Sequence, residues 1–206
     1  MDRIGILGGS FDPVHNGHLL FAQEAMDQAE LDRVFFMPTR IQPFKQDARV
    51  SSPEDRLAML ALAAEDNADF RIAKVEIERE EVSYTIRSLR RLREMFPVGT
   101  DIRFIVGSDM FLNMEKWRDA RALFREFPII AGMRPGSDER AADYARKLES
   151  DFGASVIAVK NRMFDVSSAE IRARVRAGRS IRYLTPDKVE AYIRARKLYA
   201  EACEDA

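Results

Sequence analysis

The sequence predicts an α/β protein: a doubly wound parallel sheet with helices on both faces and a short C-terminal helical part. Two observations predict this class. Short apolar runs alternate with segments of helical periodicity along most of the chain. Turns rich in glycine, proline or polar residues follow those runs, where such sheets bind their ligands. The 206 residues fit one domain, so we expect a single unit over 1–206 in which helices within 167–199 complete the site.

Each expected strand is a short apolar run bounded by turn residues. The first leads through a glycine-rich turn into a helix, Pro38 closes the second, and alternation of apolar and polar residues defines the third. The last three are strongly apolar. The expected strands are 3–8, 34–37, 70–77, 102–106, 129–133 and 156–159.

The expected helices follow from apolar periodicity together with start and stop residues. Ser52 as N-cap and Pro53 at the first helical position begin one helix, Pro97 ends another, and Gly178 ends a third. Short helical pieces are expected near Phe111 and over 120–124. The longer helices are expected at 17–29, 53–66, 83–96, 138–150, 167–175 and 186–195.

Composition limits the partners and the compartment. A net charge of −1 excludes a broad polyanion-binding surface, so we expect no nucleic-acid partner. No apolar run approaches the ~20 residues that a membrane span needs, so we expect no membrane partner. The single cysteine, Cys203, cannot form an internal disulfide, and acidic residues and histidines near the N-terminus do not resemble a signal peptide. These features favour a cytoplasmic protein.

Both histidines of the chain, His15 and His18, lie in the turn after the first expected strand. This turn has neither the dinucleotide fingerprint nor the Gly-Lys-Ser/Thr of a P-loop. A tight strand–helix turn explains its glycines and Pro13 but not two imidazoles placed about one helical turn apart. A zinc pair is the weaker alternative, because no third histidine is present and Cys203 lies in the tail. Two imidazoles that donate to phosphate oxygens at a helix N-terminus fit better.

Motifs in several parts of the chain resemble one enzyme superfamily. Residues 8–19, Gly-Gly-Ser-Phe-Asp-Pro-Val-His-Asn-Gly-His-Leu, resemble the H-x-G-H signature of the Rossmann-like nucleotidylyltransferases. Residues 167–172, Ser-Ser-Ala-Glu-Ile-Arg, resemble their second signature, Ser-Ser/Thr-x-x-Ile-Arg. The order of the remaining motifs sharpens the match to the bacterial nicotinate-nucleotide adenylyltransferases over essentially the full chain. Those motifs are Ser83-Tyr84-Thr85, Phe104–Asp109, Trp117 and Arg134-Pro135-Gly136.

The resemblance implies an activity in NAD biosynthesis. Nicotinate mononucleotide and ATP would give nicotinate adenine dinucleotide (deamido-NAD) and pyrophosphate, by in-line attack of the substrate phosphate on the ATP α-phosphate. Mg²⁺ would be bound through the ATP phosphates, with no protein metal site, and the protein would be a monomer or a homodimer. Three alternatives remain open: another H-x-G-H enzyme that accepts nicotinamide mononucleotide or phosphopantetheine, a cytidylyltransferase, and a non-catalytic nucleotide sensor.

The resemblance also implies which residues form the site. The expected catalytic residues are His15, His18 and Arg172. The expected ATP-binding residues are Gly8, Gly9, Ser10, Phe11, His15, His18, Gly107, Asp109, Arg134, Ser167, Ser168 and Arg172. The expected residues for nicotinate mononucleotide are Thr39, Lys45, Ser83, Tyr84, Thr85 and Trp117.

Several of these residues also have a purely structural interpretation. Ser167 and Glu170 fit a capping box, Ser83 could cap the helix that follows it, and Asp109 could cap the next one. A lone tryptophan such as Trp117 is usually part of a core. The functional interpretation of each therefore depends on the resemblance.

The sequence departs from the family pattern at a few positions. The loop that usually reads Pro-Pro-His-Lys is Gln42-Pro43-Phe44-Lys45, so Lys45 keeps the basic end while Phe44 replaces a histidine. Thr39 stands where asparagine is usual, and Ala169 stands where threonine is common. A loop contact to phosphate or ribose and one hydroxyl group are therefore in question.

Overall fold

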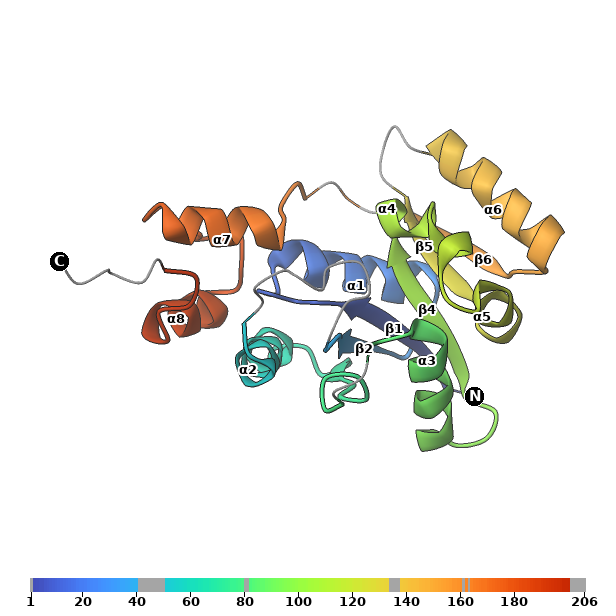
Figure 1. The fold of residues 1–206 in the computed structure, drawn as a ribbon, viewed down its shortest axis with the longest axis horizontal. Coiled ribbons are helices and arrows are strands. Elements are labelled where there is room, and N and C mark those ends of the chain that lie inside the picture. Colours follow the sequence, from blue (N-terminus) through green and yellow to red (C-terminus); the bar gives the residue numbers. More distant parts are fainter. Residues whose placement is uncertain are drawn as a thin grey trace.

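The computed structural model describes residues 2–40, 51–79, 82–133, 138–160, 162 and 164–200. Within them, six parallel strands form one sheet in the order β3-β2-β1-β4-β5-β6 (Figure 1). The strands are β1 (Arg3–Gly9), β2 (Arg33–Pro38), β3 (Phe70–Ile72), β4 (Asp101–Gly107), β5 (Ile129–Met133) and β6 (Val156–Lys160). The predicted doubly wound parallel sheet is therefore confirmed.

Helices connect the strands and cover the sheet. None of the described helices is both long and apolar enough to cross a membrane. The helices are α1 (Asn16–Gln28), α2 (Pro53–Ala64), α3 (Thr85–Met95), α4 (Ser108–Phe111), the 3₁₀ turn η1 (Met114–Lys116), α5 (Ala120–Glu126), α6 (Asp138–Phe152), α7 (Ser168–Arg176) and α8 (Asp187–Ala195). Ser52 caps α2 as predicted, since its Oγ accepts a hydrogen bond from the Asp55 backbone N–H at 3.0 Å.

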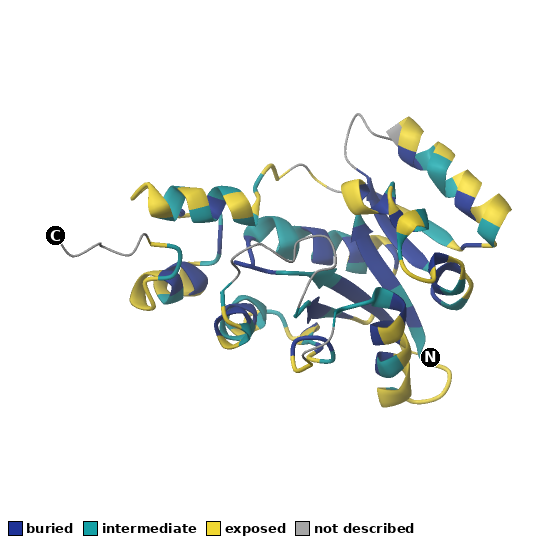
Figure 2. Cartoon of the chain, in the orientation of Figure 1, coloured by how far each residue is buried: buried dark blue, intermediate teal, exposed yellow. Residues whose placement is uncertain are grey.

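The sheet is buried on both faces, which explains why its strands are near-continuous apolar runs (Figure 2). Side chains alternate between two cores. Ile4 and Ile6 of β1 pack in one core, which α3, α5 and α6 cover, whereas Leu7 packs in the other, which α1, α2, α7 and α8 cover. In Figure 1, α7 and α8 lie at one end of the molecule, beside α1 and α2.

The strand order reverses between β1 and β4, which are neighbours in the sheet. In open parallel sheets the ligand crevice lies outside the carboxyl ends of the strands at this reversal point. Here those ends are Gly9 of β1 and Gly107 of β4. The turn that carries both histidines follows directly after Gly9, so the fold places it at the expected binding edge.

Two expected elements differ from the structure. The strand predicted over 70–77 ends at Ile72, because β3 is an edge strand that pairs only with Val34–Phe36 of β2. The chain then turns over 75–78, where the Arg79 N–H donates to the Glu76 carbonyl at 3.1 Å. The helix predicted over 83–96 begins two residues later, at Thr85. Arg40, which follows β2, donates from Nη1 to the Ile77 carbonyl at 3.0 Å, so this turn lies near the carboxyl end of β2.

Candidate active site

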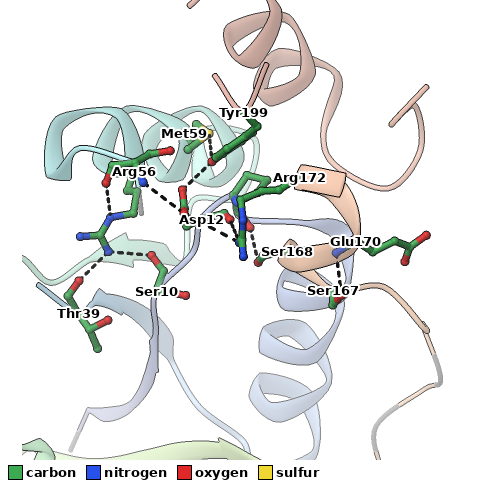
Figure 3. Close-up of polar contacts among 12 residues, drawn as sticks. Ser10, Asp12, Thr39, Arg56, Met59, Ser167, Ser168, Glu170, Arg172 and Tyr199 are labelled. Atoms are coloured by element: carbon green, nitrogen blue, oxygen red, sulfur yellow. Dashed lines mark hydrogen bonds and ion pairs between the residues drawn. The ribbon is translucent and has the colours of Figure 1, made fainter. Parts of the chain in front are cut away.

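The chain between β1 and α1, residues 10–15, is called here the β1–α1 turn, and side chains from the C-terminal part hold its backbone. Arg172 Nη1 donates to the Asp12 carbonyl at 2.6 Å, and Ser168 Oγ donates to the Pro13 carbonyl at 2.9 Å (Figure 3). Thr185 Oγ1 donates to the next carbonyl, that of Val14, at 3.0 Å. Three successive carbonyls that lie outside the sheet thus accept hydrogen bonds from side chains. A buried carbonyl that accepts no hydrogen bond would lower the stability of the fold.

The start of α1 is tied to the same part of the chain. The Asn16 backbone N–H donates to the Leu184 carbonyl at 3.0 Å, and Asn16 Nδ2 donates to the Tyr183 carbonyl at 2.8 Å. The two segments that resemble nucleotidylyltransferase signatures are therefore in direct contact, although about 150 residues separate them in the sequence.

The two histidine rings stack on each other. Their centroids are 3.6 Å apart and their planes are inclined by 21°. His15 is the N-cap residue of α1 and is buried, whereas His18 is partly exposed. The His15 backbone N–H donates to His18 Nδ1 at 3.3 Å. A neutral His18 therefore carries its proton on Nε2, which is free of that bond and can serve as a donor.

Glycines make room for these rings. A Cβ atom on Gly17 would lie 3.1 Å from His15 Nδ1 and 3.0 Å from Val166 Cγ1. A Cβ atom on Gly9 would lie 3.0 Å from Cζ of Phe11, whose backbone has a φ of 49° and whose ring contacts His18 edge-on at 5.0 Å. The glycines of this signature therefore serve packing around the imidazoles.

Both imidazoles are poor bases in this structure. Burial lowers the pKa of His15 from 6.5 to about 4. Burial also lowers the pKa of His18 well below 6.5, and the neighbouring His15 lowers it further. Both rings are therefore neutral near pH 7 in the protein without ligand, and each can donate through one N–H group.

A buried arginine that the sequence did not reveal joins the ends of β1 and β2. Arg56 of α2 is 1% exposed, and its Nη1 donates to the Ser10 carbonyl at 2.9 Å and to the Thr39 carbonyl at 2.6 Å (Figure 3). Thr39 is held from the other side, because its N–H donates to the Gly9 carbonyl at 2.9 Å. Burial lowers the pKa of Arg56, and the negative charge of Asp12 opposes that shift.

The start of α3 forms a second part of the same edge. Tyr84 is the N-cap residue of α3, and the guanidinium carbons of Arg87 and Arg118 lie 5.3 and 5.5 Å from the centre of its ring. Trp117 is partly buried and packs edge-on against Phe104, with ring centroids 6.0 Å apart. The N–H groups of Arg87 and Ser88 donate to the Tyr84 carbonyl at 2.9 and 3.2 Å, which leaves those of Thr85 and Ile86 without a carbonyl partner in the helix.

The interpretation of Ser83 as a helix cap is wrong. The helix begins at Thr85 with Tyr84 as its N-cap residue, and the buried Ser83 hydroxyl caps no N–H group of the first turn. Ser83 lies near the buried carboxyl of Glu76. Burial raises the pKa of Glu76, while the hydroxyls of Ser88 and Ser83 oppose that shift.

Of the other two expected caps, Ser167 is one and Asp109 is not. Ser167 caps α7, since its Oγ accepts from the Glu170 N–H at 3.1 Å. The Glu170 side chain instead pairs with Arg174 at 3.0 Å, so the capping box is only half formed. Asp109 does not cap α4, because Gly107 occupies the N-cap position and Asp109 lies in the first turn.

The remaining expected site residues fall into two groups. Lys45 and Arg134 lie outside the described residues, as do Gln42 and Phe44 of the unusual loop. Gly8 is the penultimate residue of β1, and Gly107 ends β4 with open space where a side chain would stand. In the described part of the chain, no three acidic, histidine or cysteine side chains gather as a metal site would require.

Fold and site together define a class of protein: a nucleotide-binding α/β domain with a stacked histidine pair at the reversal point of its sheet. The sequence profile of the cytidylyltransferase-like family matches residues 6–174. A Citrifermentans bemidjiense protein described as "Probable nicotinate-nucleotide adenylyltransferase" is 40% identical over 97% of this chain and 99% of its own. An Exiguobacterium sibiricum protein with the same description is 40% identical over 96% and 99%.

The fold is shared with solved structures. The nicotinic acid mononucleotide adenylyltransferase of Plasmodium falciparum, solved in complex with NaAD, superposes with a TM-score of 0.78. That comparison covers 97% of this chain and 98% of the other, at 19% sequence identity. The chain therefore belongs to the cytidylyltransferase-like family and, within it, to the nicotinate-nucleotide adenylyltransferases.

The lowered histidine pKa values predict a pH-dependent stability. In the unfolded chain both histidines titrate near 6.5, so between pH 6.5 and about 4 the unfolded state binds more protons than the folded state. The free energy of unfolding should therefore fall as pH is lowered through this window, by at most ~1.4 kcal/mol per pH unit for each histidine. Urea unfolding at several pH values between 7 and 5 measures the slope.

The matched variant for this measurement is His15→Asn. It removes one of the two groups, so its slope should be shallower than that of the wild type. The raised pKa of Glu76 makes the free energy of unfolding increase as pH is lowered, which is opposite to the effect of the histidines. Because Glu76 is present in both proteins, its contribution cancels in the comparison. Equal slopes would contradict the assignment of a neutral His15.

Proposed function

We propose that the protein joins nicotinate mononucleotide to ATP, giving nicotinate adenine dinucleotide and pyrophosphate. The observation that carries this proposal is the β1–α1 turn, where stacked histidines and the start of α7 meet at the reversal point of the sheet. Membership of the nicotinate-nucleotide adenylyltransferases supports the choice of substrates.

On the ATP side, the β1–α1 turn and α7 would form one phosphate cradle. We assign His18 Nε2 to the α-phosphate, with His15 beside it. Arg172 and Ser168 would hold the β- and γ-phosphates at the N-terminus of α7, where unpaired N–H groups favour anions. The side chain of Arg172 keeps 27% of its surface exposed, so it can contact a ligand while Nη1 holds the turn. The other proposed ATP-binding residues are Gly8, Gly9, Ser10, Phe11, Gly107, Asp109, Arg134 and Ser167.

The reaction needs no protein nucleophile. The phosphate of nicotinate mononucleotide, with a second pKa near 6, is largely a dianion at pH 7. One of its oxygens attacks the ATP α-phosphorus in line, a new P–O bond forms, and the bond to the bridging oxygen of the β-phosphate breaks to release pyrophosphate. The protein's task is to orient the two anions and to stabilise the negative charge of the transition state.

Neutral imidazoles suit that task. A neutral His18 donates one hydrogen bond without the cost of burying a charge, and an arriving triphosphate favours further protonation. Mg²⁺ would enter with ATP, held by phosphate oxygens and water, and would neutralise charge on the leaving pyrophosphate. This arrangement fits a described chain that gathers no acidic metal cage.

On the acceptor side, the start of α3 would recognise the nicotinate carboxylate. The N–H groups of Thr85 and Ile86 and the positive end of the α3 dipole favour an anion over a neutral amide. Trp117 would stack on the pyridinium ring, a cation–π contact of ~0.5–2 kcal/mol. Ser83 and Tyr84 would line this pocket, and Thr39 and Lys45 would contact the ribose phosphate.

We place the reaction in the cytoplasm and expect a monomer or a homodimer. The single cysteine fits a reducing compartment, and each chain contains both halves of the proposed site.

The substrate assignment is tested by pyrophosphate release from ATP with three acceptors. Nicotinate mononucleotide, nicotinamide mononucleotide and phosphopantetheine are offered in parallel, and chromatography identifies the dinucleotide formed. We expect kcat/KM for the nicotinate compound to exceed that for the nicotinamide compound about tenfold or more, because an anion at a helix N-terminus gains charge-assisted hydrogen bonds. Equal values for acid and amide would contradict the role of the α3 start, and turnover only with phosphopantetheine would contradict the function.

The role of His18 is tested by His18→Ala. We expect kcat to fall about 100-fold or more, because a positioned donor to the reacting phosphate is lost. Asp27→Ala, an exposed position of the same helix, is the matched control and should retain wild-type turnover. Thermal unfolding of both variants shows whether each is folded. A folded His18→Ala protein with near wild-type kcat would refute this mechanism.

A further inference from the structure

A tyrosine near the end of the described chain reaches into the β1–α1 turn. Tyr199 follows α8, and its backbone has a φ of 63°, as Lys197 has a φ of 52°. Its hydroxyl donates to Asp12 Oδ1 at 2.7 Å and lies 4.0 Å from Met59 Sδ (Figure 3). The C-terminal segment thus contacts the same turn that carries the histidines.

Asp12 is the junction of three segments. Its side chain is fully buried, and its Oδ2 accepts from the Ser51 N–H at 3.3 Å. Arg172 Nη1 is 2.6 Å from the main-chain carbonyl of Asp12 but 4.0 Å from its carboxylate Oδ2. The turn, α7 and the C-terminal segment therefore meet at one residue (Figure 3).

The hydrogen-bond donors to the Asp12 carboxylate affect where the Arg172 guanidinium lies. A buried carboxylate requires donors, and here the Tyr199 hydroxyl supplies a short one at Oδ1. Burial, and next the charge of Asp12, raise the pKa of Tyr199, so the phenol stays protonated and continues to donate. With these donors on Asp12, the guanidinium of Arg172 lies no closer than 4.0 Å to Oδ2 of the carboxylate.

We propose that Tyr199 is a positioning residue for adenylyl transfer, which acts through Asp12 to keep the Arg172 guanidinium available to the ATP phosphates. The inference rests on the proposed function. Without the hydroxyl, Asp12 would take Arg172 as its donor, and the guanidinium would move from the phosphate cradle toward the carboxylate.

The test compares Tyr199→Phe with Tyr192→Phe. Tyr192, on α8, donates to Asp55 Oδ1 at 2.9 Å, so the control also removes one hydroxyl bonded to an aspartate in the same part of the fold. Asp55 lies on α2, outside the β1–α1 turn. We expect similar changes in Tm for the two variants. Only Tyr199→Phe should lower kcat/KM for ATP, by about tenfold, with KM for nicotinate mononucleotide unchanged.

A double-mutant cycle with Arg172→Lys tests the route of the effect. A lysine cannot bridge the Asp12 carbonyl and a phosphate as a planar guanidinium does, so the Tyr199→Phe effect should shrink in that background. Equal kcat/KM for the two tyrosine variants would overturn the proposal, as would an undiminished effect of Tyr199→Phe in the Arg172→Lys protein. If the wild type itself forms no dinucleotide, the proposed function fails first, and that result is distinguishable from failure of the inference alone.

Discussion

The site depends on how the backbone of the β1–α1 turn is satisfied. Three successive carbonyls of this turn have no strand beside them, and each accepts a hydrogen bond from a side chain of the C-terminal part. The donors are Arg172, Ser168 and Thr185. If these bonds were absent, the turn would have to expose its carbonyls to water or distort, and the histidine pair would lose its support. The C-terminal part of the chain therefore supports the turn that carries both histidines.

This constraint explains the chemistry of the histidines. The backbone N–H of His15 fixes the tautomer of His18, and burial of the two rings lowers the pKa of each and so disfavours a charge on either. The pair is suited to donating hydrogen bonds toward an anion and poorly suited to accepting a proton as a base. Such a site fits a reaction in which the substrate phosphate is already the nucleophile.

Much of the fold could be predicted from the sequence, and so could the position of the candidate site within it. Alternating apolar runs predicted the parallel sheet, and the turn that holds both histidines follows β1 at the carboxyl edge of that sheet. The exception in the sheet is β3, where alternation continues to Ile77 but pairing stops at Phe36, although β2 itself continues to Pro38. Periodicity describes burial of side chains and carries no information on where pairing with a neighbouring strand stops.

The supporting residues could not be predicted for a different reason. Arg56 lies on a helix where an arginine usually faces water, yet its acceptors are carbonyls of Ser10 and Thr39, which are distant in sequence. Asp12 stands before Pro13, as turn formers often do, and Tyr199 lies beyond the last helix predicted, 186–195. Their roles come from hydrogen bonds to backbone atoms or across 187 residues of sequence, and no local pattern encodes those.

A crystal structure with a non-hydrolysable ATP analogue tests most directly whether the β1–α1 turn and α7 form one phosphate site. We expect His18 Nε2 and the Arg172 guanidinium within ~3 Å of phosphate oxygens, with Arg172 still bonded to the Asp12 carbonyl. A triphosphate bound elsewhere on the sheet edge, with both residues only in their present contacts, would contradict it.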